Sequence, residues 1–175
     1  MDDRLRILVE MYDIASGALD RTFADFEEGE AEWRPVPESN NIGVIVRHLS
    51  ILAEWHVDGL ERGAAMPFPP SSEQQREIDA VPIDFARNVA ELKQRIRRFV
   101  ELLRETSVEQ LEARSTSVYE GRTAERPLLL GYHQMVHLFG HLGQISMIRN
   151  LYQKTRGRPA RSFPENPTYP RSQAG

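Results

Sequence analysis

The 175-residue chain contains no cysteine. This absence excludes disulfide bonds, metal sites built on thiolates and catalysis by a cysteine nucleophile. Any metal ion in this protein must therefore be held by imidazole nitrogens or by oxygen atoms. The chain carries five histidines, so their positions are the first place to look for a metal site.

The chain also lacks an excess of positive charge and a long apolar run. It has 22 Lys and Arg against 26 Asp and Glu, a formal net charge of −4, so bulk electrostatics does not favour nucleic acid as a partner. No apolar run approaches the roughly 20 residues of a membrane-spanning helix. The start of the chain, Met1–Arg4, is acidic and shows no cationic and then apolar leader pattern. We therefore expect a cytoplasmic protein without membrane or nucleic-acid partners.

Four stretches have apolar residues at every third or fourth position, which is typical of amphipathic helices. No stretch shows a convincing strand pattern, so we predict an all-α fold, a four-helix bundle. The predicted helices run from Asp3 to about Phe26, from Ile42 to about Leu60, from Asp84 to Glu105, and from near Thr123 to near Lys154. We interpret the cationic row on the third helix as a solvated face: Lys93, Arg95, Arg97 and Arg98.

Long connectors and a tail separate and follow these helices. Helix connections in bundles usually take about 2 to 8 residues, and residues 63–83 are longer, so helices two and three can run parallel; a lid or an ordered wrap is the alternative. Residues 112–122 are expected to form an irregular loop or a short extended pair. The end of the chain is rich in Pro and Arg and too poor in apolar residues for a core of its own. We therefore predict a bundle domain over residues 1–155 and an extended tail over residues 156–175 that is either disordered or packs across a neighbour.

Three histidines follow one another at four-residue intervals in the last helix: His133, His137 and His141. Side chains four residues apart share a helix face, and His-x-x-x-His is a two-ligand half-site for a metal ion. The outer two histidines lie roughly 12 Å apart along the axis, too far for one ion. One neighbouring pair therefore binds, and the remaining histidine has another role.

A third ligand must come from another helix, and the candidates are His48 and His56 in the second one. They lie two turns apart, so they do not both serve one ion. His48 is the better candidate because it stands at the edge of the apolar arc, in the first half of its helix. His56 is more typical of a hydrogen-bonded core histidine.

Two segments together resemble the DinB/YfiT superfamily of metal-dependent enzymes. The first runs from Asn41 to Leu49 and contains His48; the second runs from His137 to Ile145 and contains His141 followed by Leu142-Gly143-Gln144. The resemblance covers roughly residues 1–154 and implies a bundle of up-down-down-up topology. It also implies a divalent metal ion on His48, His137 and His141, and commonly a homodimer. Relatives often have a basic residue where Leu142 stands, so the outward ionic contact of those relatives is not expected here.

The chemistry of such a site has several readings. Three neutral imidazoles leave positions open for water or substrate, and Zn²⁺, Ni²⁺, Fe²⁺ and Mn²⁺ all suit them, with Zn or Ni expected first. The resemblance implies a thiol-dependent S-transferase-like enzyme, in which a low-molecular-weight thiol or water attacks a small electrophile. A hydrolase on the same site and a non-catalytic, stress-associated metal-binding protein are the alternatives. Residues 138–140 carry no carboxylate, which excludes the metalloprotease form of His-x-x-x-His.

Several neighbours of the histidines keep an open role. His133 is expected to be a pocket-wall residue or a hydrogen-bond donor to a ligand, and Gln144 either binds a ligand histidine or satisfies a backbone group. Gly140 and Gly143 each cost about 1 kcal/mol in a helix interior, which close approach of a helix or a ligand would explain. The last helix is apolar on more than one side, so it is either central or shared with a partner subunit. Spacing selects none of the other polar candidates: Glu54, Asp58, Tyr119, Tyr132 and Arg149.

Overall fold

The computed structural model describes residues 2–62, 66–68, 73, 76, 80, 82–112, 117–119, 122–123 and 127–159. Four long helices dominate it, and a short helix and three short strands lie between them. The elements are α1 (Asp3–Thr22), α2 (Ile42–Arg62), β1 (Met66–Phe68), α4 (Phe85–Glu105), α5 (Val108–Glu112), β2 (Ser117–Tyr119), β3 (Arg122–Thr123) and α6 (Pro127–Thr155). The predicted helical class is therefore confirmed, while the proposed tail from residue 160 onward lies outside the described residues.

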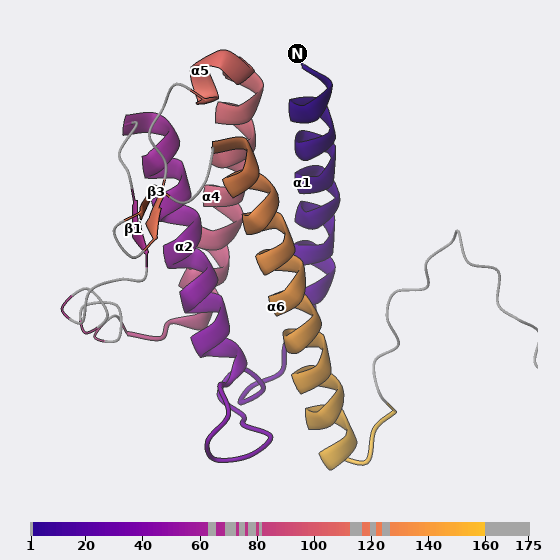
Figure 1. Cartoon of the computed structure of the whole chain (residues 1–175). Coiled ribbons are helices and arrows are strands. Elements are labelled where there is room, and N and C mark those ends of the chain that lie inside the picture. The colour runs from indigo at the N-terminus through magenta and orange to yellow at the C-terminus, as the bar shows by residue number, and fades with distance from the viewer. Residues whose placement is uncertain are drawn as a thin grey trace, which may run out of the picture.

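The long helices lie side by side along one axis (Figure 1). Helices α1 and α6 run in one direction, and α2 and α4 run in the opposite direction. Helix α2 packs against α4 and α6, and α1 packs against the same two helices. Their buried side chains merge into a single core, represented by Leu8, Leu49, Ile96 and Leu138. Burying one such side chain contributes about 1.5–3 kcal/mol, so these faces hold the bundle together.

Local capping determines where most of these helices begin. Asp2 accepts from the backbone N–H of Arg4 at 2.8 Å, and Asp84 accepts from that of Arg87 at 3.0 Å. Asn41 accepts from the N–H of Val44 at 2.9 Å and so begins α2. Ser107 and Gln110 exchange side-chain to backbone hydrogen bonds of 2.9 and 3.1 Å, which form the reciprocal capping box at the start of α5. All of these residues are polar types that the sequence places immediately before an apolar run.

Two predicted boundaries are wrong. Helix α1 ends at Thr22 and not at Phe26: Asp25 takes a positive φ of 54°, and the ring of Phe26 turns to pack on Phe85, with centroids 4.5 Å apart. The apolar spacing of the sequence continues past the end of the helix because Phe26 packs against Phe85 after the chain has left the helical path. Helix α6 begins at Pro127, where a missing N–H is tolerated, whereas Thr123 lies in β3.

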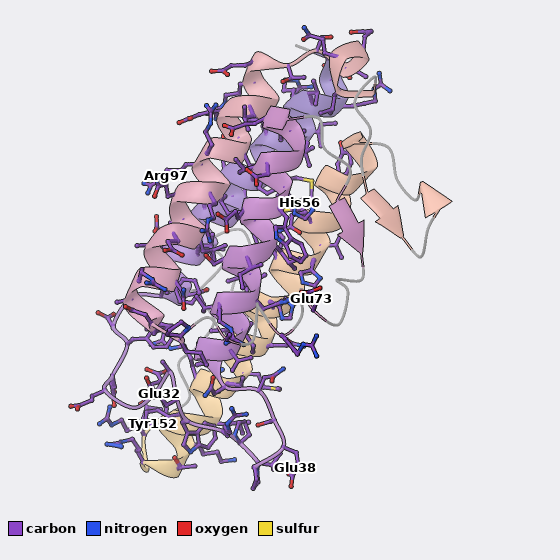
Figure 2. The ribbon with its side chains drawn as sticks, turned by 90° about the vertical axis from the view of Figure 1, so that its left-hand side faces the viewer. Glu32, Glu38, His56, Glu73, Arg97 and Tyr152 are labelled. Atoms are coloured by element: carbon purple, nitrogen blue, oxygen red, sulfur yellow. The ribbon has the colours of Figure 1, made fainter. Side chains whose placement is uncertain are left out.

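The cationic row of α4 is only partly a solvated face. Arg97 is exposed and points away from the bundle (Figure 2). Lys93 pairs with Asp20 of α1 at 2.7 Å, and Arg98 pairs with Glu61 of α2 at 2.8 Å. The remaining members of the row therefore link α4 to its neighbours.

The short strands form a small sheet in the order β1-β2-β3. Strand β1 pairs with β2 in parallel, and β2 pairs with β3 antiparallel. This sheet joins the connector after α2 to the segment before α6, and it includes the short extended pair anticipated between residues 112 and 122. Most of the connector, residues 63–83, lies outside the described residues. A lid or an ordered wrap formed by this connector therefore stays a prediction. None of the described helices has the length and apolarity needed to cross a bilayer.

Candidate metal centre

Three histidines from two helices meet between α2 and α6. His48 of α2 and His137 of α6 have their Nε2 atoms 3.1 Å apart, and the Nε2 atoms of His137 and His141 are 3.0 Å apart. All three side chains are half-buried, and one nitrogen of each lies within 4.8 Å of the others. The structure thus brings together the residues that the sequence singled out, across 89 positions of the chain.

The spacing of these nitrogen atoms suits one metal ion. Imidazole nitrogens bind Zn²⁺ at about 2.0–2.1 Å, which puts two ligands roughly 2.9 to 3.4 Å apart for angles of about 90° to 110°. Both Nε2 separations, 3.1 and 3.0 Å, fall in this range. Each neutral imidazole has a single N–H group, so the three rings can form few hydrogen bonds with one another at this distance. A shared cation would instead accept a lone pair from each of the three rings.

Gln144 binds the far nitrogen of one ligand candidate. Its Oε1 lies 2.7 Å from Nδ1 of His141. An amide oxygen only accepts, so His141 donates from Nδ1 and presents the lone pair of Nε2 toward His48 and His137. Of the two roles left open for Gln144, the structure therefore shows contact with a histidine. The three-residue spacing on one helix permits this contact but does not require it.

The position of His48 favours the neutral form of its ring. Burial lowers the pKa of His48 below its ordinary value, and the proximity of His141 and of Arg47 lowers it further. A neutral imidazole is the form that binds metal ions. The influence of Arg47, the preceding residue in α2, was not anticipated; its adjacency to His48 is the signal that could have revealed it.

The other histidines of the chain have different settings. His56 is 6 % exposed, and its Nδ1 donates to the carbonyl of Leu52. Its ring also meets the edge of Phe99, with centroids 6.2 Å apart, and Figure 2 shows it within the bundle. The prediction of a core histidine is confirmed. The side chain of His133 lies outside the described residues, so its predicted role stays a prediction.

Three of the five other polar candidates are engaged elsewhere. Arg149 is buried and pairs with Glu30 at 2.7 Å, and Glu54 pairs with Arg95 at 3.1 Å. Tyr132 donates its hydroxyl to the carbonyl of Arg4 at 2.9 Å. Each of these contacts joins segments of the bundle and does not involve the three histidines.

No fourth His, Asp or Glu among the described residues joins the histidine group. The three side chains are half-buried, so each keeps part of its surface exposed to solvent among the described residues. A metal site with three protein ligands and an open position is typical of catalysis, whereas structural sites are usually closed by four. The three described histidines match the number of protein ligands in the first kind of site.

A family model adds an independent finding. The model of the DinB superfamily matches residues 11–145. This span contains His48, His137, His141 and Gln144 and covers more than half of the chain. The comparisons with curated proteins and with solved structures give no significant match.

Proposed function

Because the chain belongs to the DinB superfamily, we propose that it is a metal-dependent enzyme whose single divalent ion is held by His48, His137 and His141. The observation that carries this proposal is the convergence of three Nε2 atoms from two helices, with neighbouring separations of 3.1 and 3.0 Å. A divalent ion such as Zn²⁺ would supply a Lewis acid that lowers the pKa of a bound thiol or water. Zn and Ni are the metals we expect first.

The three histidines provide uncharged ligands that are held in a fixed orientation and half-buried from water. Burial and nearby positive charge hold the pKa of His48 below its ordinary value, so its lone pair is available at neutral pH. The amide of Gln144 keeps the proton of His141 on Nδ1. Three neutral ligands add no negative charge, so the full charge of the cation remains available to stabilise an anionic nucleophile. Half-burial of the rings limits competing water without closing the site.

The reaction that we favour is transfer of a low-molecular-weight thiol to a small electrophile. In this step the thiol loses its proton, its sulfur forms a bond to an electrophilic carbon, and the leaving group departs with the bonding pair. No Asp or Glu among the described residues joins the histidine group, so we expect the thiol proton to pass to solvent. Hydrolysis by an activated water is the alternative on the same ligands, and a metal-stabilised bundle without turnover is the third reading.

Product analysis distinguishes these readings. The metal-loaded protein would be incubated with a panel of alkyl halides, epoxides and esters, with and without thiols such as cysteine and glutathione. We expect thioether products that require the thiol and that fall at least about 100-fold in His48→Ala and His141→Ala, since each variant removes one of three ligands. Arg97→Ala, exposed on α4, is the matched control and should retain full activity. Thiol-independent hydrolysis would favour the second reading, and no turnover across the panel would favour the third.

A further inference from the structure

Helix α6 leaves one apolar face open to solvent. Val136 is 69 % exposed, Met147 is 56 % exposed and Leu151 is 39 % exposed, and Gly140 and Gly143 lie on the same face between the first two. No other segment among the described residues comes within 4 Å of where a Cβ would stand on either glycine. The close approach expected for these glycines is therefore absent within the described part of the chain, and this face has room for a further segment.

Helix α1 presents a second apolar stripe beside this face. Ile7 and Ile14 are 46 % and 62 % exposed, and they lie two helical turns apart on one side of α1. Tyr132 of α6 donates its hydroxyl to the carbonyl of Arg4, one turn before Ile7, so the stripe runs beside the contact between the two helices. The exposed apolar residues of both helices form one surface, the α1/α6 face: Ile7, Ile14, Val136, Met147 and Leu151.

The end of α6 directs the chain toward the end of α1. Gly157 takes a positive φ of 69°, and the N–H groups of Gly157 and Arg158 donate to the carbonyls of Lys154 and Gln153. These two hydrogen bonds form a Schellman motif, which ends the helix. Arg158 then pairs with Glu27, in the connector that follows α1. The chain therefore leaves α6 on the side at which α1 ends.

The C-terminal segment, residues 160–175, lies outside the described residues, and its sequence favours an extended chain. Every third residue from 164 to 170 is proline, and a residue before proline is restricted to extended conformations. A polyproline II helix has three residues per turn, so Phe163 and Tyr169 would share one edge of it, two turns apart. Such a segment presents two aromatic side chains to one surface without a large loss of conformational entropy.

The length of this segment matches the length of the face. A polyproline II helix advances about 3.1 Å per residue, and an α-helix advances about 1.5 Å per residue. Counted from Arg158, Phe163 lies about 16 Å along the segment, and Met147 lies about 17 Å along α6. Tyr169 and Val136 lie at about 34 Å and about 33 Å on the same two scales. A segment that turns back along α6 therefore brings each aromatic residue level with an exposed apolar residue of that helix.

We propose that the C-terminal segment docks in extended form on the α1/α6 face of its own chain, antiparallel to both helices. Phe163 then packs on Met147, and Tyr169 packs on Val136 and Ile7. These contacts bury two aromatic rings against side chains that are otherwise exposed, which supplies the free energy of docking.

Space, charge and covalent attachment favour this segment as the occupant of the face. Asn166 comes level with Gly140 and Gly143, whose missing side chains leave room for a backbone to pass. Arg171 comes level with Asp3 in the first turn of α1, since both lie about 40 Å from the end of α6. The side chain of Asp3 is 86 % exposed, so the two charges can approach each other. A segment of the same chain also has an effective concentration in the millimolar range, which favours it over a separate molecule.

Trypsin cleavage after Arg171 in the full-length chain tests this contact. Cleavage requires an undocked stretch of backbone. We expect the wild type to be cleaved at least about tenfold more slowly than Ile14→Glu and Met147→Glu, because each variant places a charge beneath the docked segment. Val36→Glu is the matched control: Val36 is 54 % exposed in the connector before α2, and its cleavage should match that of the wild type. Equal rates in the wild type and in both face variants would overturn the proposal.

Protein concentration distinguishes the C-terminal segment from a second copy of the chain as the cover of this face. Docking within one chain does not depend on concentration, so the slow cleavage should persist over a roughly hundredfold dilution. Protection that is lost on dilution would assign the cover to a second copy and would contradict docking within the chain.

Cross-linking tests the direction and the reach of the segment. Since the chain has no cysteine, Asp3→Cys with Arg171→Cys should form a disulfide within one chain on mild oxidation. Val36→Cys with Arg171→Cys is the matched control and should remain uncrosslinked. Glu38, close to Val36 in the connector, lies at the same end of the bundle as Tyr152 (Figure 2), so an undocked segment would reach Val36 more easily than Asp3. Equal or greater cross-linking to Val36, disulfides only between chains, or no disulfide in the first variant would each rule out the proposed docking.

Discussion

Gln144 is the residue through which the chain controls the orientation of His141. Its amide oxygen accepts from Nδ1 at 2.7 Å, and a partner of this kind fixes both the tautomer and the direction of a metal-binding imidazole. The side chain is exposed, so its removal opens no cavity in the core. The effect of changing it should therefore appear in metal affinity more than in folding.

We predict that Gln144→Ala weakens metal binding by about 10- to 100-fold with little change in the free energy of unfolding of the metal-free protein. Competition against a chelator of known affinity measures the first quantity, and urea unfolding measures the second. Gln144→Glu keeps a hydrogen-bond acceptor at the same position. Its metal affinity should be at least as high as that of Gln144→Ala and closer to that of the wild type. An affinity for Gln144→Ala equal to that of the wild type would show that the amide does not orient His141.

His48 links the pH dependence of stability to the same site. Its pKa is lower in the folded protein than its ordinary value of 6.5, chiefly because of burial. The unfolded chain therefore binds the proton more readily than the folded one as the pH falls. The metal-free protein therefore keeps its full stability above the ordinary histidine pKa and loses stability as the pH falls below it.

We expect the free energy of unfolding of the metal-free protein to decrease between pH 7.5 and pH 5.5, and to decrease less in His48→Gln. Urea unfolding in the presence of a chelator at the two pH values checks this difference. A loss of stability in His48→Gln equal to or larger than that of the wild type would assign the pH dependence to other groups.

At the scale of elements, one buried ion pair holds α6 to the connector that follows α1. Arg149 and Glu30 are 4 % and 0 % exposed, with Nε and Oε1 2.7 Å apart. The same guanidinium donates to the carbonyls of Ala24 and Asp25, each at 3.1 Å, and lies over the ring of Phe26 at 4.0 Å. It thus satisfies the carbonyl groups of the turn that ends α1.

We predict that Arg149→Met destabilises the protein by about 3–5 kcal/mol, because it leaves the buried carboxylate of Glu30 without its counter-charge. The double variant Arg149→Met with Glu30→Gln should recover part of this loss. Arg104→Met removes an exposed pair with Asp13 and is the matched control, with an expected loss below about 1 kcal/mol. Urea unfolding of the four proteins gives the comparison, and a loss below about 1 kcal/mol for Arg149→Met would contradict a structural role for the pair.

Local features of the elements could be predicted from the sequence, whereas contacts between distant segments could not. Caps such as Asn41, Asp84 and Ser107 are accessible to sequence reasoning because their hydrogen bonds reach only three residues along the chain. The end of α1 at Thr22 was missed because Phe23 and Phe26 continue the apolar pattern while packing on Phe85. The ion pair of Arg149 and Glu30 spans 119 positions, and no periodicity encodes such a pairing.

At the scale of the whole molecule, the candidate site depends on how α2 and α6 meet. Helix spacing identified His137 and His141 as a half-site, but His133 with His137 has the same spacing. The pairing with His48 is a property of the bundle, and from the sequence it rested on the place of His48 at the edge of an apolar arc and on the resemblance to a family. The role of Gln144 depends on which rotamer of His141 faces the other helix, which is why spacing left it open.

Our central claim is that His48, His137 and His141 form one metal site where α2 and α6 meet. Metal content tests this claim most directly. We predict about one equivalent of divalent metal per chain in the purified wild type, by inductively coupled plasma mass spectrometry, since three imidazoles converge on one point. Most of this metal should be lost in His48→Ala and in His141→Ala, and Arg97→Ala should retain it. Unchanged metal content in both histidine variants would contradict the claim.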